Sequence, residues 1–291
     1  MFDFIAHGKK FLMISGILVL VSILALSFWG LKMGIDFEGG AISQVKFLEE
    51  RPTNVEIVKK LDSLELGDIS VRLSGSDSAI LRFLEIDEEV HQQILELLGE
   101  VEEESYEMVG PVIGREASRK ARSAIFLSLL AIILYVTWAF RKLSRVLGKG
   151  ESWRYGVGAT LALAHDVLIL LGFFALMGHF QGIEINVAFI TALLTVLGYS
   201  VNDTIVIYDR IRENLLLHRA KDLRETINLS LNETITRSLN TSLTTVSVLL
   251  AIYIFGGEAI QSFILAMMIG VISGTWSSLV IASQFLLWRR K

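Results

Sequence analysis

Two aspartates lie inside long apolar stretches of this 291-residue sequence. Asp203, beside Asn202, interrupts the run 185–208, and Asp166 interrupts the run 157–177. Five residues separate Asp203 from Tyr208, so helical rise places its carboxylate about 7 to 8 Å inside one end of a helix. A carboxylate at bilayer depth needs a partner or a wet cavity, and the chemistry open to it there is uptake and release of a proton.

Arg237 is the predicted counter-charge for Asp203. It opens the apolar run 239–255, and consecutive antiparallel helices would bring its side chain to the same end as Asp203. We predict a proton relay in which Asp203 carries the proton, Arg237 sets its affinity and Asn202 lies alongside. A fixed structural ion pair is the alternative. Asp166 is either a helper in the same relay or a hydrogen-bonded packing residue.

Six apolar runs are long enough to position these residues in a bilayer, which requires roughly 20 residues per helix. The predicted spans are 11–29, 124–140, 157–177, 185–208, 239–255 and 263–288. The sequence therefore predicts a polytopic α-helical membrane protein with six transmembrane helices. We expect three parts: 1–30 with the N-terminus and first helix, a domain at 31–122, and a five-helix region at 123–291.

Lysine and arginine predict the orientation of the spans. Basic residues cluster at 9–10, 141–154, 210–237 and 289–291, whereas the short loops 178–184 and 256–261 contain none. All four clusters lie on one side if both termini are cytoplasmic. In a bacterium this places the protein in the inner membrane and the segment 31–122 in the periplasm.

The segment 31–122 is acidic and reads as an α+β domain. Its pattern predicts strands at 42–47, 69–73, 79–84 and 103–109, and helices at 54–64 and 87–98. The order strand, helix, strand, strand, helix, strand is that of a ferredoxin-like domain between helices 1 and 2. His91 is the only histidine of this segment, and we interpret it as a solvated residue on an exposed helix face.

Glycines mark two kinds of position. Those that frame the acidic domain are predicted to be elbows or hinges: Gly34, Gly39, Gly40, Gly110 and Gly114. In the last span a spacing of four residues predicts a small-residue face for close helix packing, formed by Gly270, Gly274 and Ser278.

Several classes of chemistry are excluded or unsupported. The sequence has no cysteine, which excludes thiolate catalysis, disulfides and cysteine-ligated zinc. Two carboxylates near Gly34 do not make a metal site, and neither glycine segment has phosphate-loop spacing. A net charge of −4 provides no basic field for nucleic acid. We expect a protein that is not an enzyme and needs no cofactor or metal.

Six motifs together resemble the SecF family, the smaller half of the bacterial SecDF protein-export factor, over essentially the whole length. They are GIDFEGG at 34–40, VGPVIGRE at 109–116, AHD at 164–166, GYSVNDTIVIYDR at 198–210, RSLNTSLTT at 237–245 and GTWSS at 274–278. The resemblance implies membership of the resistance-nodulation-division (RND) superfamily and partnership with SecD, YajC and the SecYEG translocon with SecA. It also implies that the proton motive force promotes late translocation of a preprotein, with Asp203 and Arg237 in proton transport.

Two other functions remain open at this point. A half-length RND-type exporter of lipids or small molecules would share the superfamily, but such exporters have two six-helix repeats and far larger outer loops. A non-transporting translocon scaffold would suit the acidic domain and the small-residue helix faces among membrane lipids. It would leave Asp203 without a purpose that offsets its cost.

Overall fold

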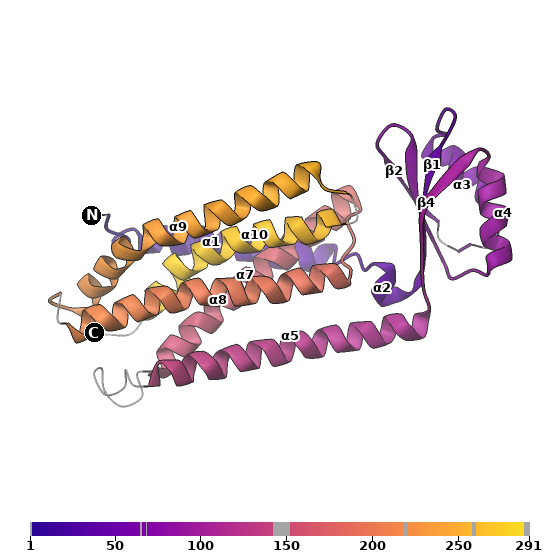
Figure 1. Cartoon of the computed structure of the whole chain (residues 1–291). Helices are drawn as coiled ribbons and strands as arrows, with labels where there is room; N and C mark the ends of the chain where they lie inside the picture. The colour runs from indigo at the N-terminus through magenta and orange to yellow at the C-terminus, as the bar shows by residue number, and fades with distance from the viewer. Residues whose placement is uncertain are drawn as a thin grey trace. The chain divides into compact units, whose positions relative to one another are not determined.

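The computed structural model describes residues 2–64, 66–67, 69–141, 152–217, 220–257 and 260–287. Its contacts divide the chain into a membrane unit, formed by 1–32 and 123–291, and an α/β domain, Met33–Arg122 (Figure 1). Much of the positive charge used to predict orientation lies outside the described residues, namely Lys142, Arg145, Lys149, Arg219, Arg289, Arg290 and Lys291.

Six helices in the described part of the chain are long and apolar enough to cross a bilayer, which confirms the six predicted spans. They are α1 (Gly8–Phe28), α5 (Pro111–Ala139), α7 (Ser152–Gln181), α8 (Val187–Leu216), α9 (Leu223–Phe255) and α10 (Gln261–Ser277). A π-helical turn, η3 (Ser278–Ala282), and the short α11 (Ser283–Phe285) continue α10 to the end of the described chain.

Two helices begin well before their predicted spans. α5 begins at Pro111, a residue suited to the first helical position, and α9 begins at Leu223, where the Asp222 side chain accepts a hydrogen bond from the Glu225 backbone. An apolar run reveals only the part of a helix at bilayer depth, whereas these helices continue as polar turns. Gly114, predicted to lie in an elbow, instead lies within the first turns of α5, and its role as a hinge stays a prediction.

The interior of the membrane unit is formed mainly by α7, α8 and α10, while α5 and α9 are largely exposed. At one end Tyr155 and Tyr208 are fully buried and pack edge to face, with ring centroids 4.9 Å apart. The Tyr208 hydroxyl donates a hydrogen bond of 3.0 Å to the carbonyl of Ala282. This bond ties α8 to the π-helical turn.

The first residues of the chain are attached to the polar beginning of α9. The backbone N–H groups of Phe2 and Phe4 donate to the side-chain oxygens of Asn232 and Asn228, each at 2.9 Å. The Asn232 amide also donates to the Phe2 carbonyl at 2.8 Å. Two asparagines one helical turn apart therefore attach the first residues of the chain to α9.

The α/β domain has the predicted ferredoxin-like order. Its elements are α2 (Ile35–Glu38), β1 (Gly40–Phe47), α3 (Asn54–Leu61), β2 (Ser70–Ser74), β3 (Ser78–Phe83), α4 (Glu88–Leu98) and β4 (Val101–Val109). The sheet runs β2-β3-β1-β4 with every neighbouring pair antiparallel. Its core joins sheet residues such as Val45 and Leu81 to Ile57 of α3 and Ile94 of α4.

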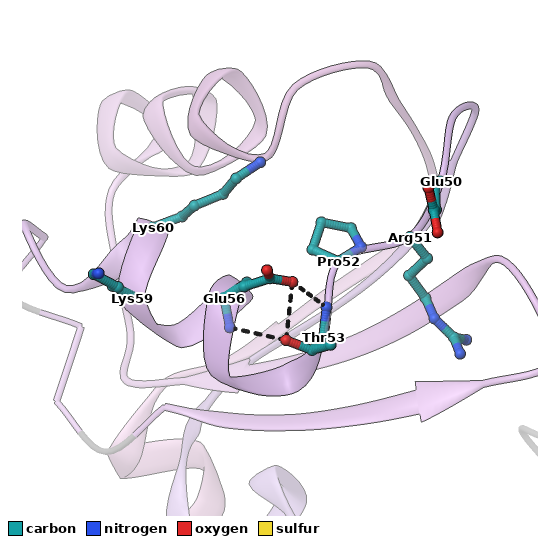
Figure 2. Close-up of a pocket in the computed structure, with 7 residues that line it drawn as sticks. All are labelled: Glu50, Arg51, Pro52, Thr53, Glu56, Lys59 and Lys60. Carbon is teal, nitrogen blue, oxygen red and sulfur yellow. Dashed lines mark hydrogen bonds between the residues drawn. The ribbon is translucent and has the colours of Figure 1, made fainter.

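Thr53 begins α3 with the predicted N-cap, here a complete capping box (Figure 2). The Thr53 N–H donates to the Glu56 carboxylate at 2.8 Å, and the Glu56 N–H donates to the Thr53 hydroxyl oxygen at 3.4 Å. The bond from the Thr53 N–H, and a second at 2.9 Å from the Thr53 hydroxyl, stabilise the ionised carboxylate and hold the pKa of Glu56 below its ordinary value of 4.5. The adjoining pocket is lined by Glu50, Arg51, Pro52, Thr53, Glu56, Lys59 and Lys60.

Polar groups of this pocket are engaged within the domain. Arg51 donates to the carbonyls of Ser74 and Gly75, at 3.0 and 2.9 Å, and Lys60 donates to the Leu98 carbonyl at 3.2 Å. Arg51 therefore ties the segment before α3 to the end of β2 and the following turn, and Lys60 ties α3 to the end of α4.

The interpretation of His91 as a solvated residue is wrong. Its side chain is buried, stacks on Tyr106 with ring centroids 3.9 Å apart, and lies 2.9 Å from the Glu103 carboxylate. The cause is twofold. His91 shares the core-facing side of α4 with Ile94, and a β-bulge beside Val45 turns Glu103 onto the helix-covered face of the sheet.

The chain takes a backbone conformation that favours glycine at the first predicted elbow, whose role as a hinge stays a prediction. Gly34 precedes α2, and Gly39 and Gly40 follow it with positive φ of 87° and 121°, where a side chain would be strained. A Cβ added to Gly114 would lie 3.0 Å from the Gly39 nitrogen, so this glycine allows α5 to approach α2 closely. Gly110 immediately precedes α5.

Candidate proton-transfer site

Asp166 of α7 is fully buried and surrounded by hydroxyl groups. Ser200 of α8 and Ser277 of α10 donate to its Oδ2 at 2.6 and 2.7 Å. Ser273 of α10 donates to its Oδ1 at 2.8 Å, and Nδ1 of His165 lies 3.1 Å from the same oxygen. Three helices thus meet at one carboxylate. This arrangement is consistent both with a helper in the proton relay and with a hydrogen-bonded packing residue.

Asp203 of α8 has a similar but smaller set of partners. Its Oδ1 accepts a hydrogen bond of 2.5 Å from Ser238 of α9, and its Oδ2 accepts one from Ser278 at the end of α10. The carboxylate is half-buried, because α9 and α10 cover only part of it. It is therefore more accessible than Asp166.

Consecutive residues of one helix connect the two acids. Ser277 contacts Asp166 and Ser278 contacts Asp203. Neighbouring helical residues point about 100° apart, so a single turn of α10 reaches α7 on one side and α8 on the other. The helix changes from α to π geometry at Ser278, and π-helical turns of this kind occur frequently at functional sites.

Close packing of α10 against α8 brings the serines within reach. A Cβ added to Gly274 would lie 2.8 Å from the Ser200 Cβ, and one added to Gly270 would lie 2.5 Å from Cγ1 of Val196. Neither glycine can accept a side chain without displacing α8. The third residue of the predicted small-residue face, Ser278, provides a hydrogen bond to Asp203 as well as a small volume.

Arg237 does not form the expected ion pair in this structure. Within the described residues, no hydrogen bond or ion pair joins its side chain to Asp203, and the side chain is exposed on α9. The contact to Asp203 is made instead by Ser238, the next residue. Asn202 is likewise exposed on α8. The participation of both residues in proton transfer stays a prediction.

Two buried polar atoms near the acids have no hydrogen-bond partner among the described residues: Nε2 of His165 and the hydroxyl of Tyr199. A buried donor or acceptor without a partner costs about 1 to 3 kcal/mol. A water molecule could supply the missing hydrogen bond at either atom. The described residues contain no group of three or more histidine, cysteine, aspartate or glutamate side chains that could hold a metal ion.

The serines are the site residues that sequence reasoning missed. Ser273 and Ser277 are four residues apart on α10, a spacing that places two hydroxyls on one helix face. Serine in a membrane helix usually bonds to its own backbone, so the pattern alone did not indicate a carboxylate partner. Pairing them with Asp166 required the crossing of α7 and α10.

Comparison with known proteins gives matches over nearly the whole chain. Residues 89–291 match the family described as "Protein export membrane protein SecD/SecF, C-terminal". The SecF protein translocase subunit of Thermobaculum terrenum is 38% identical, over 100% of this chain and 95% of the relative. That of Anaerolinea thermophila is 35% identical, over 96% and 92%.

Solved structures agree with the sequence matches. The crystal structure of SecDF, a translocon-associated membrane protein from Thermus thermophilus, matches with a TM-score of 0.84 and 32% identity. The match covers 98% of this chain and 38% of that longer one. A SecDF structure described as a super-membrane-facing form matches with a TM-score of 0.69 and 30% identity. The chain is therefore a multi-pass membrane protein of the transport class, not an enzyme, and belongs to the SecD/SecF family of protein export membrane proteins, among its SecF members.

Proposed function

We propose that this chain uses the proton motive force to promote late translocation of a preprotein, with Asp203 as the residue that takes up and releases the proton. The observation that carries the proposal is the environment of Asp203: a half-buried carboxylate between membrane helices, held by the hydroxyls of Ser238 and Ser278. A membrane-embedded carboxylate is a functional-site candidate by default.

The type of partner favours proton transfer over a fixed ion pair. A hydroxyl can donate to an ionised carboxylate and can also accept from a protonated one. Serine partners therefore accommodate both protonation states with little rearrangement, whereas an arginine in contact would hold the carboxylate ionised. In this arrangement Arg237 acts when it approaches Asp203 during the cycle, and Asp166 is the second acid of the relay.

Exposed polar groups support a membrane partner, which we identify as SecD. The side chains of Asn202, Arg237 and Asn240 are exposed on α8 and α9, and none has a hydrogen-bond or ion-pair partner among the described residues. Lipid cannot satisfy such groups, but a second set of helices can. The neighbouring Thr241 and Thr244 hydroxyls bond to their own helix backbone and tolerate lipid.

The rest of the assembly follows from the family and from charge. We place both termini in the cytoplasm and the α/β domain in the periplasm, because the basic clusters then lie inside. SecYEG with SecA, and YajC, complete the proposed set of partners. The α/β domain would act on the emerging preprotein at the periplasmic face.

A vesicle assay tests the proposal. The chain and SecD are placed in inner-membrane vesicles lacking both, and release of a translocating preprotein is followed with and without a proton gradient. Asp203→Asn keeps the shape of the side chain but removes its titratable proton, so gradient-dependent release is expected to disappear.

Asp209→Asn is the matched control, because Asp209 lies on the same helix, is exposed and pairs with Arg212 at 2.6 Å. It is expected to retain release. Unchanged release in Asp203→Asn, with the complex assembled, would contradict the proposal and leave the scaffold function in its place.

A further inference from the structure

We propose that Ser277 and Ser278 are positioning residues that couple the protonation of Asp166 to that of Asp203 through one turn of α10. The inference deepens the proposed function and rests on it in one respect: both acids must exchange protons. It assigns to two consecutive serines a role that their small size alone would not indicate.

Each of the two serines has two acceptors within reach and only one hydrogen. Ser277 can donate to Asp166 at 2.7 Å or to the carbonyl of Gly274, three residues earlier, at 3.1 Å. Ser278 can donate to Asp203 or to the carbonyl of Thr275, also three residues earlier, at 3.0 Å. The two residues thus repeat one arrangement at successive positions.

Protonation of a carboxylate selects between the two acceptors. An ionised carboxylate only accepts, so the serine hydrogen points to it. A protonated carboxyl group carries its own hydrogen and donates it to the serine oxygen, and the serine hydrogen then turns to the backbone carbonyl. The proton stays on the carboxyl group throughout, and the serine hydrogen moves only by rotation about its C–O bond.

The carbonyls of Gly274 and Thr275 belong to a single helical turn, so both acids act on the same stretch of backbone. A serine bond to a carbonyl three residues back competes with the helical hydrogen bonds of that turn and bends the helix. At this point α10 is already changing from α to π geometry. Once one serine has turned, the shifted backbone alters the position of the other serine, which couples the two acids.

The titratable groups that face the acids are few. Within the described residues, His165 on α7 lies beside Asp166 at 3.1 Å, and the Asp203 carboxylate contacts the hydroxyls of α9 and α10. His165 is present in every variant below, so its titration contributes equally to each. Tyr199 lies one turn before Asp203 on α8, and Arg237 is exposed on α9; both are likewise present in every variant below. The difference between variants therefore reports on the serines.

Infrared spectroscopy of the whole chain in lipid vesicles measures the coupling directly. The carbonyl band of a protonated carboxyl group is followed as pH is varied, and the bands are assigned by their loss in Asp166→Asn and Asp203→Asn. We expect Asp203→Asn to move the titration midpoint of Asp166 by about one pH unit, which is a tenfold change in proton affinity.

Replacing both serines tests the route. In a Ser277→Ala, Ser278→Ala background, the effect of Asp203→Asn on Asp166 is expected to fall to less than a third. Ser283→Ala is the matched control: Ser283 is buried in α11, bonds to the carbonyl of Leu279 and has no carboxylate partner among the described residues. The full effect should remain in this control and in Ser277→Thr, Ser278→Thr, which keeps both hydroxyls.

Either of two results would overturn the inference. An effect that persists in full without the hydroxyls would show coupling through space, and no effect in the parent chain would show that the acids are independent. If the doubly substituted chain fails to fold, Ser278→Ala alone gives the same comparison. Failure here leaves the preprotein-release assay unaffected, so the proposed function and this inference can fail separately.

Discussion

Close packing between α8 and α10 makes Gly270 a sensitive small residue of the membrane unit. We predict that Gly270→Ala destabilises the chain, although alanine is the better helix former by about 1 kcal/mol. The added Cβ would meet Val196, with Cγ1 at 2.5 Å and Cβ at 2.9 Å. Valine in a helix has one strongly preferred rotamer, so its methyl groups cannot turn aside.

The required displacement sets the magnitude. Ordinary contacts begin at 3.4 Å, and Cγ2 of Val196 lies even nearer than Cγ1, so α8 and α10 must separate by more than about 0.9 Å if Val196 stays in its rotamer. Overpacking of this kind typically costs about 1 to 3 kcal/mol. Val196→Ala removes both methyl carbons and leaves the Cβ at 2.9 Å as the nearest obstacle, which lowers the required separation to roughly 0.5 Å.

A double-mutant cycle on the purified chain in micelles measures this effect. Unfolding free energies are compared for Gly270→Ala, Val196→Ala and the combination, with Gly16→Ala as control because nothing lies within 4 Å of its added Cβ. The combination should be more stable than the sum of the single effects by about 1 kcal/mol, within the range measured for contacting residues. Additive effects, or a Gly270→Ala chain as stable as the control, would refute the close packing.

Three further predictions concern the α/β domain, each read by hydrogen exchange in the whole chain. Thr53→Ala should lower protection of α3 by about 1 kcal/mol through loss of the cap. Thr53→Ala should also reduce the loss of α3 protection as the pH is lowered. The reason is that the lowered pKa of Glu56 adds stability that is present above the pKa of the unfolded chain and lost as pH falls. An unchanged pH dependence of α3 protection would contradict this. His91→Ala should cost about 2 to 4 kcal/mol, since it leaves Glu103 with one buried partner, and unaltered protection of α4 would show that the contact is unimportant. Burial raises the pKa of Tyr106, so the domain should lose stability as pH rises above about 10, and Tyr106→Phe should abolish that loss while keeping the stack on His91.

Structural features that depend on residues close together in the sequence were predictable. Apolar length identified the six spans, and Thr53 and Gly99 marked the ends of helices in the α/β domain. These features depend on neighbours within a few residues. Helix starts at Pro111 and Leu223 were missed because polar helical turns leave no apolar signal.

Features that depend on contacts across the fold were not predictable in the same way. His91 is buried because a bulge in β4 turns Glu103 toward it, and nothing near His91 in sequence shows that bulge. The two acids were recognised from their cost in a membrane, but the serines that hold each of them come from two neighbouring helices. The sequence therefore indicates which polar residues need hydrogen-bond partners, and the fold determines which residues those partners are.

The length of α9 has a mechanical consequence. Its 33 residues span about 50 Å, whereas the hydrocarbon core of a bilayer is about 30 Å thick. Roughly 20 Å of the helix therefore projects into water at the end that carries Asn228 and Asn232, stiffened by the N-terminal segment bound there. A tilt of about ten degrees at bilayer depth would move that tip by roughly 3 Å. A small reorientation of α9 beside Asp203 would thus displace the part of this helix that lies outside the bilayer core.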